Sequence, residues 1–175
     1  FCLCPPSRRM IIKLKTGVKK DGRITAQQVK IIDDVGAYRR SSPTALYLAH
    51  VFRNPIYNIP NLLHEGYGVY TNKLYTTAKR GHGLPQIVFA VESQIDIICD
   101  HLGLDKVEMR LKNLRKKGDT LPNGDVLRSY ALPECLKQAA EKIGWKEKYG
   151  KEKFRGLGIG SGSMFSGAHN FPFSS

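Results

Sequence analysis

The residues of this chain best suited to chemistry lie in a short cationic segment with two glycines. An apolar-periodic segment that ends at Leu102 follows it directly. Backbone N–H groups of such a loop, together with the positive end of the following helix, can hold an anionic ligand. The same residues could also form only a tight turn before a helix. The segment reads Lys79-Arg80-Gly81-His82-Gly83-Leu84-Pro85-Gln86.

Each residue type in this loop has a reason to be there. Gly81 and Gly83 let the backbone approach a ligand closely and take dihedral angles that other residues disfavour. Pro85 fits the first turn of the helix, where its missing N–H is not needed. The segment therefore predicts an anion-binding loop at a helix start.

The four cysteines exclude two classes of site. Cys2, Cys4, Cys99 and Cys135 are too few and too scattered for a disulfide framework or a structural zinc site, and no second pair accompanies Cys2-x-Cys4. We therefore predict no metal ligands in this chain. Cysteine usage of this kind indicates a reducing compartment, and we expect a cytoplasmic protein.

Composition and charge indicate a globular protein with a basic surface. Of the 175 residues, 41% are hydrophobic and 25% charged, and no apolar run is long enough for a membrane span. The formal net charge is +13, which suggests a nucleic-acid binder as one class. However, the charges are spread along the chain and no nucleic-acid motif accompanies them. We expect a basic outer surface or a docking face for an acidic partner, rather than a nucleic-acid partner.

Several segments indicate a sheet. Residues 11–19 and 23–35 read as two strands joined by Asp21-Gly22, a strong hairpin signal, with a bulge expected near Gln27-Gln28. Residues 44–51 suit a short helix and residues 63–70 another strand. Residues 155–163 read as a strand with glycine at every second place, so another element or a ligand should lie against its bare face.

Three helices are expected after the cationic loop. The first spans residues 86–102 and ends at Gly103, and its opposite side carries Glu92, Asp96 and Asp100. This acidic stripe is either solvated or met by cations and backbone donors of another element. A capping pattern from Asp105 opens the second helix, which runs to about residue 116. The third begins at Pro133 and ends before Gly144, with Trp145 packed back on it.

These elements predict an α+β fold, a twisted antiparallel sheet with packed helices. We expect residues 1–9 to be a loose leader. Residues 10–72 should form the hairpin and sheet part, residues 73–150 the helical part and residues 151–175 the glycine-rich strand.

The order and spacing of many short motifs resemble one family over nearly the whole chain, from about Met10 to Ser175. That family is the large, molybdenum-cofactor-binding subunit of the xanthine dehydrogenase and aldehyde oxidase group of molybdenum hydroxylases. The matching motifs are Lys15-Thr-Gly17, Lys20-Asp-Gly-Arg-Ile-Thr-Ala26, Gly36-Ala37-Tyr38, Tyr57-x-Ile59-Pro60-Asn61, Tyr70-Thr-Asn72, Arg80-Gly-His-Gly83, Pro85-Gln86, Glu92-x-x-x-Asp96, Leu102-Gly103-x-Asp105, Glu108-x-Arg110 and Lys112-Asn113.

The resemblance implies roles for the cationic loop. Arg80, Gly81 and Gly83 would bind the molybdenum–molybdopterin cofactor, either as such or as its cytosine dinucleotide. His82 stands where the family usually has a phenylalanine that stacks on an aromatic substrate. The Glu92/Asp96 pair belongs to the family's helix signature, which argues against a solvated stripe.

The resemblance also implies what this chain lacks. The family's catalytic glutamate would lie beyond Ser175, and the glycine- and phenylalanine-rich cofactor loop would precede this region, so the chain resembles a middle slice of a larger subunit. We therefore predict no catalytic residue in this chain. Its partners would be the remaining part of the molybdenum subunit and the domains or subunits that carry iron–sulfur clusters and FAD.

The function implied is hydroxylation of an N-heterocyclic, aromatic or aldehyde substrate, with water as the oxygen source. We expect the isolated chain to be inactive. The alternative is a non-catalytic remnant or binding module that keeps only the scaffold. The arginine that holds purines in some members would fall at or beside Leu48, and no arginine lies between Arg40 and Arg53, so we expect a substrate other than xanthine.

Overall fold

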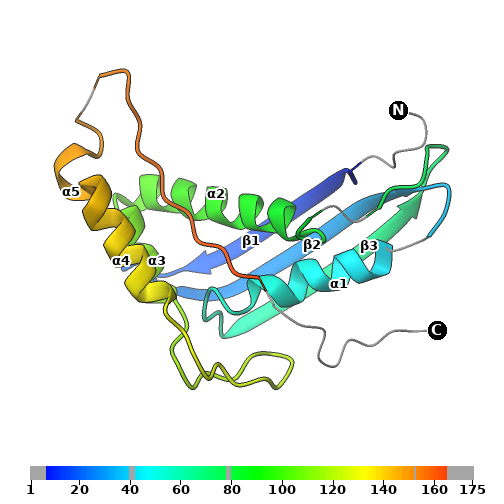
Figure 1. Ribbon diagram of the computed structural model, residues 1–175, viewed down its shortest axis with the longest axis horizontal. Helices are drawn as coiled ribbons and strands as arrows, with labels where there is room; N and C mark the ends of the chain where they lie inside the picture. The colour runs from blue at the N-terminus through cyan, green and yellow to red at the C-terminus, as the bar shows by residue number, and fades with distance from the viewer. Residues whose placement is uncertain (1–6, 40–41, 78–79, 152, 165–175) are drawn as a thin grey trace.

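A three-stranded sheet with helices packed on it forms the framework of the protein (Figure 1). The structure is a computed structural model. It describes residues 7–39, 42–77, 80–151 and 153–164. None of the described helices combines the length and the apolar character needed to cross a membrane.

The predicted hairpin is confirmed. Strands β1 (Met10–Val18) and β2 (Ile24–Gly36) pair antiparallel, and Gly22 takes a φ of 85° in the turn between them. The register shifts between Gly17 and Val18, which pair with Ala26 and Ile24, so β2 has its bulge at Thr25, two residues before the predicted Gln27-Gln28. Gln27 points inward and its side chain bonds to Thr16 and Arg53, so this polar residue does not interrupt the pairing.

The third strand corrects the predicted sheet. Strand β3 (Asn61–Tyr70) pairs with β2 in parallel, from Ala26 opposite Asn61 onward, and the sheet is therefore mixed rather than antiparallel throughout. Helix α1 (Ser42–Arg53) connects the two strands and returns the chain to the other end of the sheet. A crossover of this kind allows neighbouring strands to run in the same direction. The α+β class itself is confirmed.

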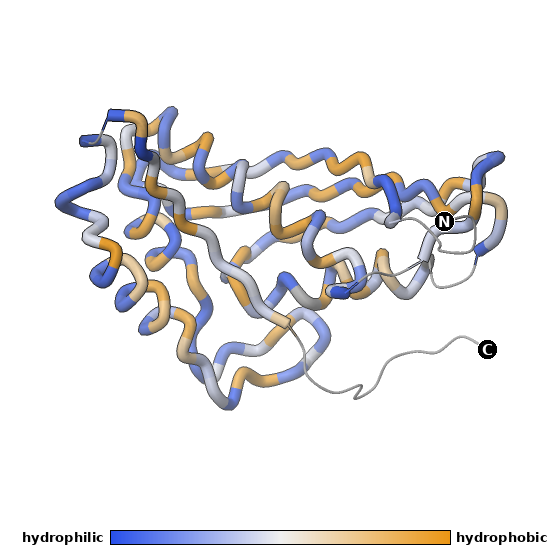
Figure 2. Tube along the Cα trace, turned by 45° about the horizontal axis from the view of Figure 1, so that its top comes forward, coloured by the Kyte–Doolittle hydropathy of each residue, from blue (hydrophilic) through white to orange (hydrophobic). Residues whose placement is uncertain are grey.

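Helices α1 and α2 (Leu84–Leu102) cover the same face of the sheet. Gln27 of β2 accepts a hydrogen bond from Arg53 of α1, and Thr16 of β1 donates one to Gln94 of α2. Hydrophobic and hydrophilic residues alternate along the strands in Figure 2. The inward-facing set packs against the two helices, so the core lies between this face and the helices. That core includes Val29, Ile31, Leu48, Ile87, Val91 and Ile95.

The helical part follows the predicted signals. Gly103 ends α2 in a left-handed conformation, and its N–H donates to the carbonyl of Cys99. The Asp105 side chain caps α3 (Lys106–Asn113) by accepting from Val107 N and Glu108 N. After α4 (Leu132–Ile143), Trp145 opens α5 (Trp145–Lys148) and packs back on the domain, donating from Nε1 to Asp105 Oδ2 at 2.8 Å.

The glycine-rich segment does not form the predicted strand. Residues 155–164 contain no strand in the described part of the chain and run as an extended segment beside α2 (Figure 1). Ser161 N donates to the side chain of Glu92 instead of to a neighbouring strand. A Cβ added at Gly156, Gly158 or Gly162 would meet no described atom within 4 Å, whereas one on Gly160 would lie 3.6 Å from Glu92 Oε2. Among the described elements, α2 therefore lies against the bare face at Gly160, as expected of another element, but the other three glycines face no described atom. Residues 165–175 lie outside the described residues.

The predicted leader is not loose at its described end. Ser7 forms a parallel bridge with Thr77, and Arg8 is 5% exposed and pairs with Asp33. The boundary predicted at residue 9 is therefore too late for these two residues, because a buried ion pair holds them against the sheet. Cys2 and Cys4 lie outside the described residues.

Two half-buried histidines lie next to each other between α1 and β3. The ring centroids of His50 and His64 lie 4.5 Å apart, and the positive charge of Arg53 acts on both rings. Burial, followed by the charge of Arg53, lowers the pKa of His50 to about 4. Burial, then His50 and Arg53, lowers the pKa of His64 to about 3. Both rings are therefore neutral in the fold at neutral pH.

This pair predicts acid sensitivity. The unfolded chain takes up protons as pH falls below 6.5, whereas the folded chain does so only toward pH 4 and 3, so stability is full above pH 6.5 and falls below it. The upper limit of this effect is about 1.4 kcal/mol for each pH unit and each proton taken up. Because both rings are partly accessible, we expect a smaller loss in the free energy of unfolding, about 1–2 kcal/mol in total between pH 7 and 5. Urea denaturation at both pH values measures it.

A double variant isolates this contribution. Combining His50→Gln with His64→Gln should remove most of the difference between the two pH values, while His101→Gln, at an exposed site, should preserve it. An equal pH dependence in parent and double variant would assign the effect to other groups.

Candidate functional site

The cationic loop forms a left-handed turn into α2. Gly81, His82 and Gly83 all have positive φ, at 96°, 47° and 90°. Leu84 N donates to Gly81 O at 2.9 Å, and Pro85 lies in the first helical turn, as predicted. Left-handed backbone is unusual for a residue with a Cβ, so His82 is held there by the glycines on both sides.

Both glycines are also needed for packing. A Cβ on Gly81 would lie 2.8 Å from Pro85 Cδ, and one on Gly83 would lie 2.8 Å from the carbonyl oxygen of Ala45 in α1. The start of α2 can therefore approach α1 only with glycine at position 83. The tight-turn interpretation thus holds for the backbone, and an anion-binding role has to rest on the surroundings of the loop.

Those surroundings form a cavity of about 200 Å³ at the start of α2. Of the described residues that line it, two are arginines and none is acidic. Gln86 Oε1 is buried there and has no hydrogen-bond partner in the described part of the chain. A charged group with its own N–H or O–H would fit these residues. The lining residues are Ser7, Arg8, Arg80, Gly83, Pro85 and Gln86.

The structure separates the four predicted site residues. Arg80 and Gly83 line the cavity, while Gly81 is buried in the turn behind it. His82 is exposed and is not among the lining residues, so its ring is available on the outer side of the loop.

Sequence reasoning missed Arg8. Its Nη1 lies 2.6 Å from Oδ2 of Asp33, which is fully buried in β2. The available signal was Asp33 itself, which falls in the inward series of Val29, Ile31 and Val35. A carboxylate among buried apolar residues requires a cationic or hydrogen-bonding partner, and Arg8 is that partner.

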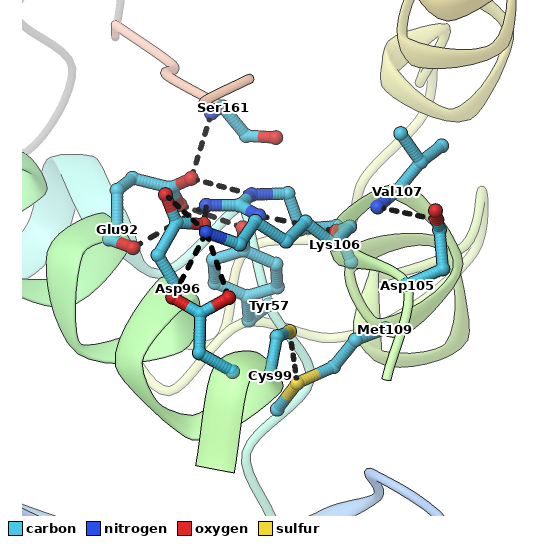
Figure 3. A network of polar contacts seen from close by, with 11 residues as sticks. Tyr57, Glu92, Asp96, Cys99, Asp105, Lys106, Val107, Met109 and Ser161 are labelled. Atoms are coloured by element: carbon cyan, nitrogen blue, oxygen red, sulfur yellow. Dashed lines mark hydrogen bonds and ion pairs between the residues drawn. The ribbon is translucent and has the colours of Figure 1, made fainter. Parts of the chain in front are cut away.

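The acidic side of α2 is paired rather than solvated (Figure 3). Arg110 of α3 is fully buried, and it donates from Nε to Glu92 and from Nη2 to Asp96, both at 2.8 Å. Lys106 lies 3.1 Å from a carboxylate oxygen of Asp100. The alternative in which cations of another element meet the stripe is therefore correct.

Glu92 joins four segments of the chain. Besides Arg110, it accepts a hydrogen bond from the Tyr57 hydroxyl at 2.6 Å and one from Ser161 N at 3.0 Å. Burial and the negative charge of Glu92 raise the pKa of Tyr57, which therefore stays protonated as a donor. The network fixes the course of the segment after residue 155. Among the described residues, no three His, Cys, Asp or Glu side chains are grouped to hold a metal ion.

A family model for the molybdopterin cofactor-binding domain matches residues 4–114, more than half of the chain. The chain belongs to this family. The match includes the whole cationic loop, the start of α2 and Arg8. The family implied by the short motifs is thereby confirmed, as is its character as a molybdenum-dependent oxidoreductase family with a molybdopterin cofactor.

Related proteins agree with this membership. The nicotinate dehydrogenase large molybdopterin subunit of Eubacterium barkeri is 37% identical over 147 residues, which are 83% of this chain and 34% of that protein. The aldehyde oxidoreductase of Megalodesulfovibrio gigas is 34% identical over 162 residues, 89% of this chain and 18% of that protein. The chain thus spans about a third or less of these relatives.

Solved structures show the same fold. The aldehyde oxidoreductase from Desulfovibrio gigas superposes with a TM-score of 0.70 at 33% identity, covering 83% of this chain and 17% of that one. Quinoline 2-oxidoreductase from Pseudomonas putida 86, at 24% identity, gives a TM-score of 0.72 over 80% of this chain and 19% of that one. The latter likeness concerns the fold alone.

Proposed function

We propose that this chain forms one wall of the cofactor site of a molybdenum hydroxylase, within a longer polypeptide of the length of its relatives. The observation that carries the proposal is the cavity at the start of α2, where Arg80 and Gly83 meet with no acidic residue among the described lining. An anionic cofactor is favoured at such a place, because both the guanidinium and the helix start attract negative charge.

In this proposal, Arg80, Gly81 and Gly83 each have a different role in cofactor binding. The exposed guanidinium of Arg80 would donate hydrogen bonds to oxygen atoms of the cofactor, and Gly83 would allow its backbone to come close. Gly81, with a φ of 96°, would maintain the turn that positions the Arg80 side chain and the Gly83 backbone. When bound, the molybdenum cofactor supplies the two-electron oxidation that hydroxylates a carbon with oxygen from water. The family's base would come from beyond this chain.

The remaining components complete the proposal. The cofactor is molybdenum–molybdopterin, in the plain form or as the cytosine dinucleotide. Electrons leave through iron–sulfur clusters and FAD on partner domains or subunits, and the remaining part of the molybdenum subunit closes the site. We place the enzyme in the cytoplasm, in keeping with the few, scattered cysteines of the sequence.

His82 and Leu48 favour an acidic heteroaromatic substrate. His82 is exposed beside the cavity, where an imidazole offers a hydrogen-bond donor to a substrate carboxylate. Leu48, at the position expected for the purine-holding arginine, is 6% exposed and packs in the core, and it has no charge to offer. The nicotinate dehydrogenase subunit among the relatives is consistent with such a substrate.

This proposal predicts turnover of nicotinate-like acids in preference to xanthine by the longer enzyme. A missing bidentate donor removes a few kcal/mol of transition-state binding, so kcat/KM for xanthine should be about a hundredfold lower or more. Steady-state assays with an artificial electron acceptor measure both substrates. His82→Phe should lower kcat/KM for the acid and leave that for an aldehyde nearly unchanged. Faster turnover of xanthine than of every other candidate would overturn the substrate assignment.

The isolated 175-residue chain should hold little molybdenum and show no turnover. A cofactor clamped by several loops loses most of its contacts when one wall is alone, and no general base accompanies it. Metal analysis of the purified chain and assays with aldehydes and heterocycles test this. Stoichiometric molybdenum, or turnover of any of these substrates, would contradict the proposal. An inactive longer polypeptide would favour the scaffold-only alternative.

A further inference from the structure

Arg8 lies closer to the candidate site than its place in the sequence suggests. Arg8 precedes β1, and all three strands lie between it and Arg80 in the sequence. Both residues nevertheless line the same cavity. The Arg8 side chain is 2% exposed, and its Nη1 lies 2.6 Å from Asp33 Oδ2. Neighbouring backbone contacts fix its position, because Ser7 bridges Thr77 and Arg9 O accepts a hydrogen bond from Asp34 N at 3.0 Å.

We infer that Arg8 is a second cationic ligand of this cavity, that it acts with Arg80 on a multiply charged oxyanion group of the bound molecule, and that Asp33 holds it in place. The inference rests on the proposed function and extends it to a residue on a different segment. The ligand chemistry is that of a phosphate ester or of an oxometalate, both of which present several anionic oxygens.

Charge favours this assignment over a purely structural ion pair. Among the described residues that line the cavity, Arg8 and Arg80 are cationic and none is anionic. Asp33, which is not one of the lining residues, neutralises the charge of Arg8 only. Two guanidinium groups around about 200 Å³ repel each other unless an anion lies between them. An anion with two or more charged oxygens would satisfy both.

Side-chain chemistry supports the same conclusion. A guanidinium presents five N–H donors in a planar fork, so Arg8 can donate to Asp33 and to other acceptors as well, an oxygen atom in the cavity among them. The neighbouring Gln86 Oε1, buried and without a hydrogen-bond partner in the described part, can accept from an O–H or N–H of the same ligand. Arg8, Arg80 and Gln86 thus come from separate positions but offer complementary bonds to one group.

Titration of the full 175-residue chain with pyrophosphate and, in a second arm, molybdate tests the inference. Amide signals of Gly81 and Gly83 and the Nε–H signals of the arginines, followed by NMR, report binding and its dissociation constant. We expect saturable binding that shifts the Nε–H signal of Arg8 as well as that of Arg80. A preference for pyrophosphate points to the phosphate ester as the natural group, and a preference for molybdate to the oxometalate.

Three variants separate ligand binding from fold support. Arg8→Lys keeps a cation for Asp33 but loses the planar fork, and it should weaken binding about tenfold. Arg23→Lys is the matched control at an exposed site and should leave the dissociation constant unchanged. Asp33→Asn keeps an oxygen that can accept from Arg8 and hold it in place, but it removes the carboxylate charge that competes with the ligand, so it should tighten binding. This variant also decides the matter if Arg8→Lys fails to fold.

The outcomes distinguish this inference from the proposed function. Suppose that Arg80→Ala abolishes binding, that Arg8→Lys and Asp33→Asn leave the dissociation constant unchanged, and that the Nε–H signal of Arg8 does not shift. Arg8 then has a structural role only and the inference is wrong, whereas the proposed role of the cationic loop in cofactor binding is retained. If the parent chain binds neither anion, or Arg80→Ala changes nothing, the inference is wrong, whereas the proposed function is tested separately by the molybdenum content of the longer polypeptide.

Discussion

Ile95→Asp should unfold this chain, whereas Ile97→Asp, two residues along the same helix, should leave it folded. Ile95 is 3% exposed in the core between α2 and the sheet, and Ile97 is 66% exposed on the outer side. The buried carboxylate has no partner, which costs more than about 4–5 kcal/mol, a large part of the stability of a domain of this size. The exposed one should cost within about 0.5 kcal/mol.

Thermal unfolding followed by circular dichroism measures both variants. The expected result is loss of the cooperative transition in Ile95→Asp and a nearly unchanged midpoint in Ile97→Asp. Equal midpoints for Ile95→Asp and the parent would mean that this side of α2 is not core.

Arg110→Met should be the next most damaging substitution. Arg110 is fully buried, pairs with Glu92 and Asp96, and also donates to the backbone carbonyl of Lys106. Although burial alone lowers the pKa of an arginine, Glu92 and the other partners raise that of Arg110, so it remains charged. Removing it leaves the mostly buried carboxylate of Glu92, 11% exposed, without its cation, and we expect a loss of about 3–5 kcal/mol.

Urea denaturation compares this variant with Lys112→Met, an exposed cation on the same helix that should cost less than about 1 kcal/mol. Adding Glu92→Gln to Arg110→Met should recover part of the loss, because the unpaired charge is then removed. A loss in Arg110→Met no larger than that in Lys112→Met would show that the network contributes little.

Local signals in the sequence predicted the elements that depend on neighbouring residues. The hairpin rests on Asp21-Gly22, the end of α2 on Gly103 and the start of α3 on the side chain of Asp105, and each is confirmed. In each case a turn or a cap is formed by residues a few positions apart. A short sequence pattern is therefore enough to predict each of these turns and caps.

Features that depend on distant partners were not predictable in this way. The parallel pairing of β3 follows from the path of α1 across the sheet, and strand periodicity alone does not give a direction. The segment around Ser161 alternates like a strand, but its partner is a carboxylate of α2. Arg8 lies outside every periodic segment, so only the buried Asp33 indicated that a cation had to come from elsewhere.

The candidate site was located in part by its residue types. The glycines and Pro85 predicted the turn into α2, and Arg80 and Gly83 do line a cavity there. The other wall, from Ser7 and Arg8, comes from a segment that sequence reasoning had assigned to a loose leader. The roles of the loop toward a cofactor stay a prediction.

Molybdenum content tests the central claim most directly. The longer polypeptide that includes this chain is purified as the parent, as Arg80→Ala and as Arg128→Ala, a control in an exposed loop, and molybdenum per chain is measured by mass spectrometry. We predict nearly stoichiometric molybdenum in the parent and the control, and about ten- to hundredfold less in a folded Arg80→Ala protein. Equal molybdenum in all three would contradict a cofactor-binding role for this loop.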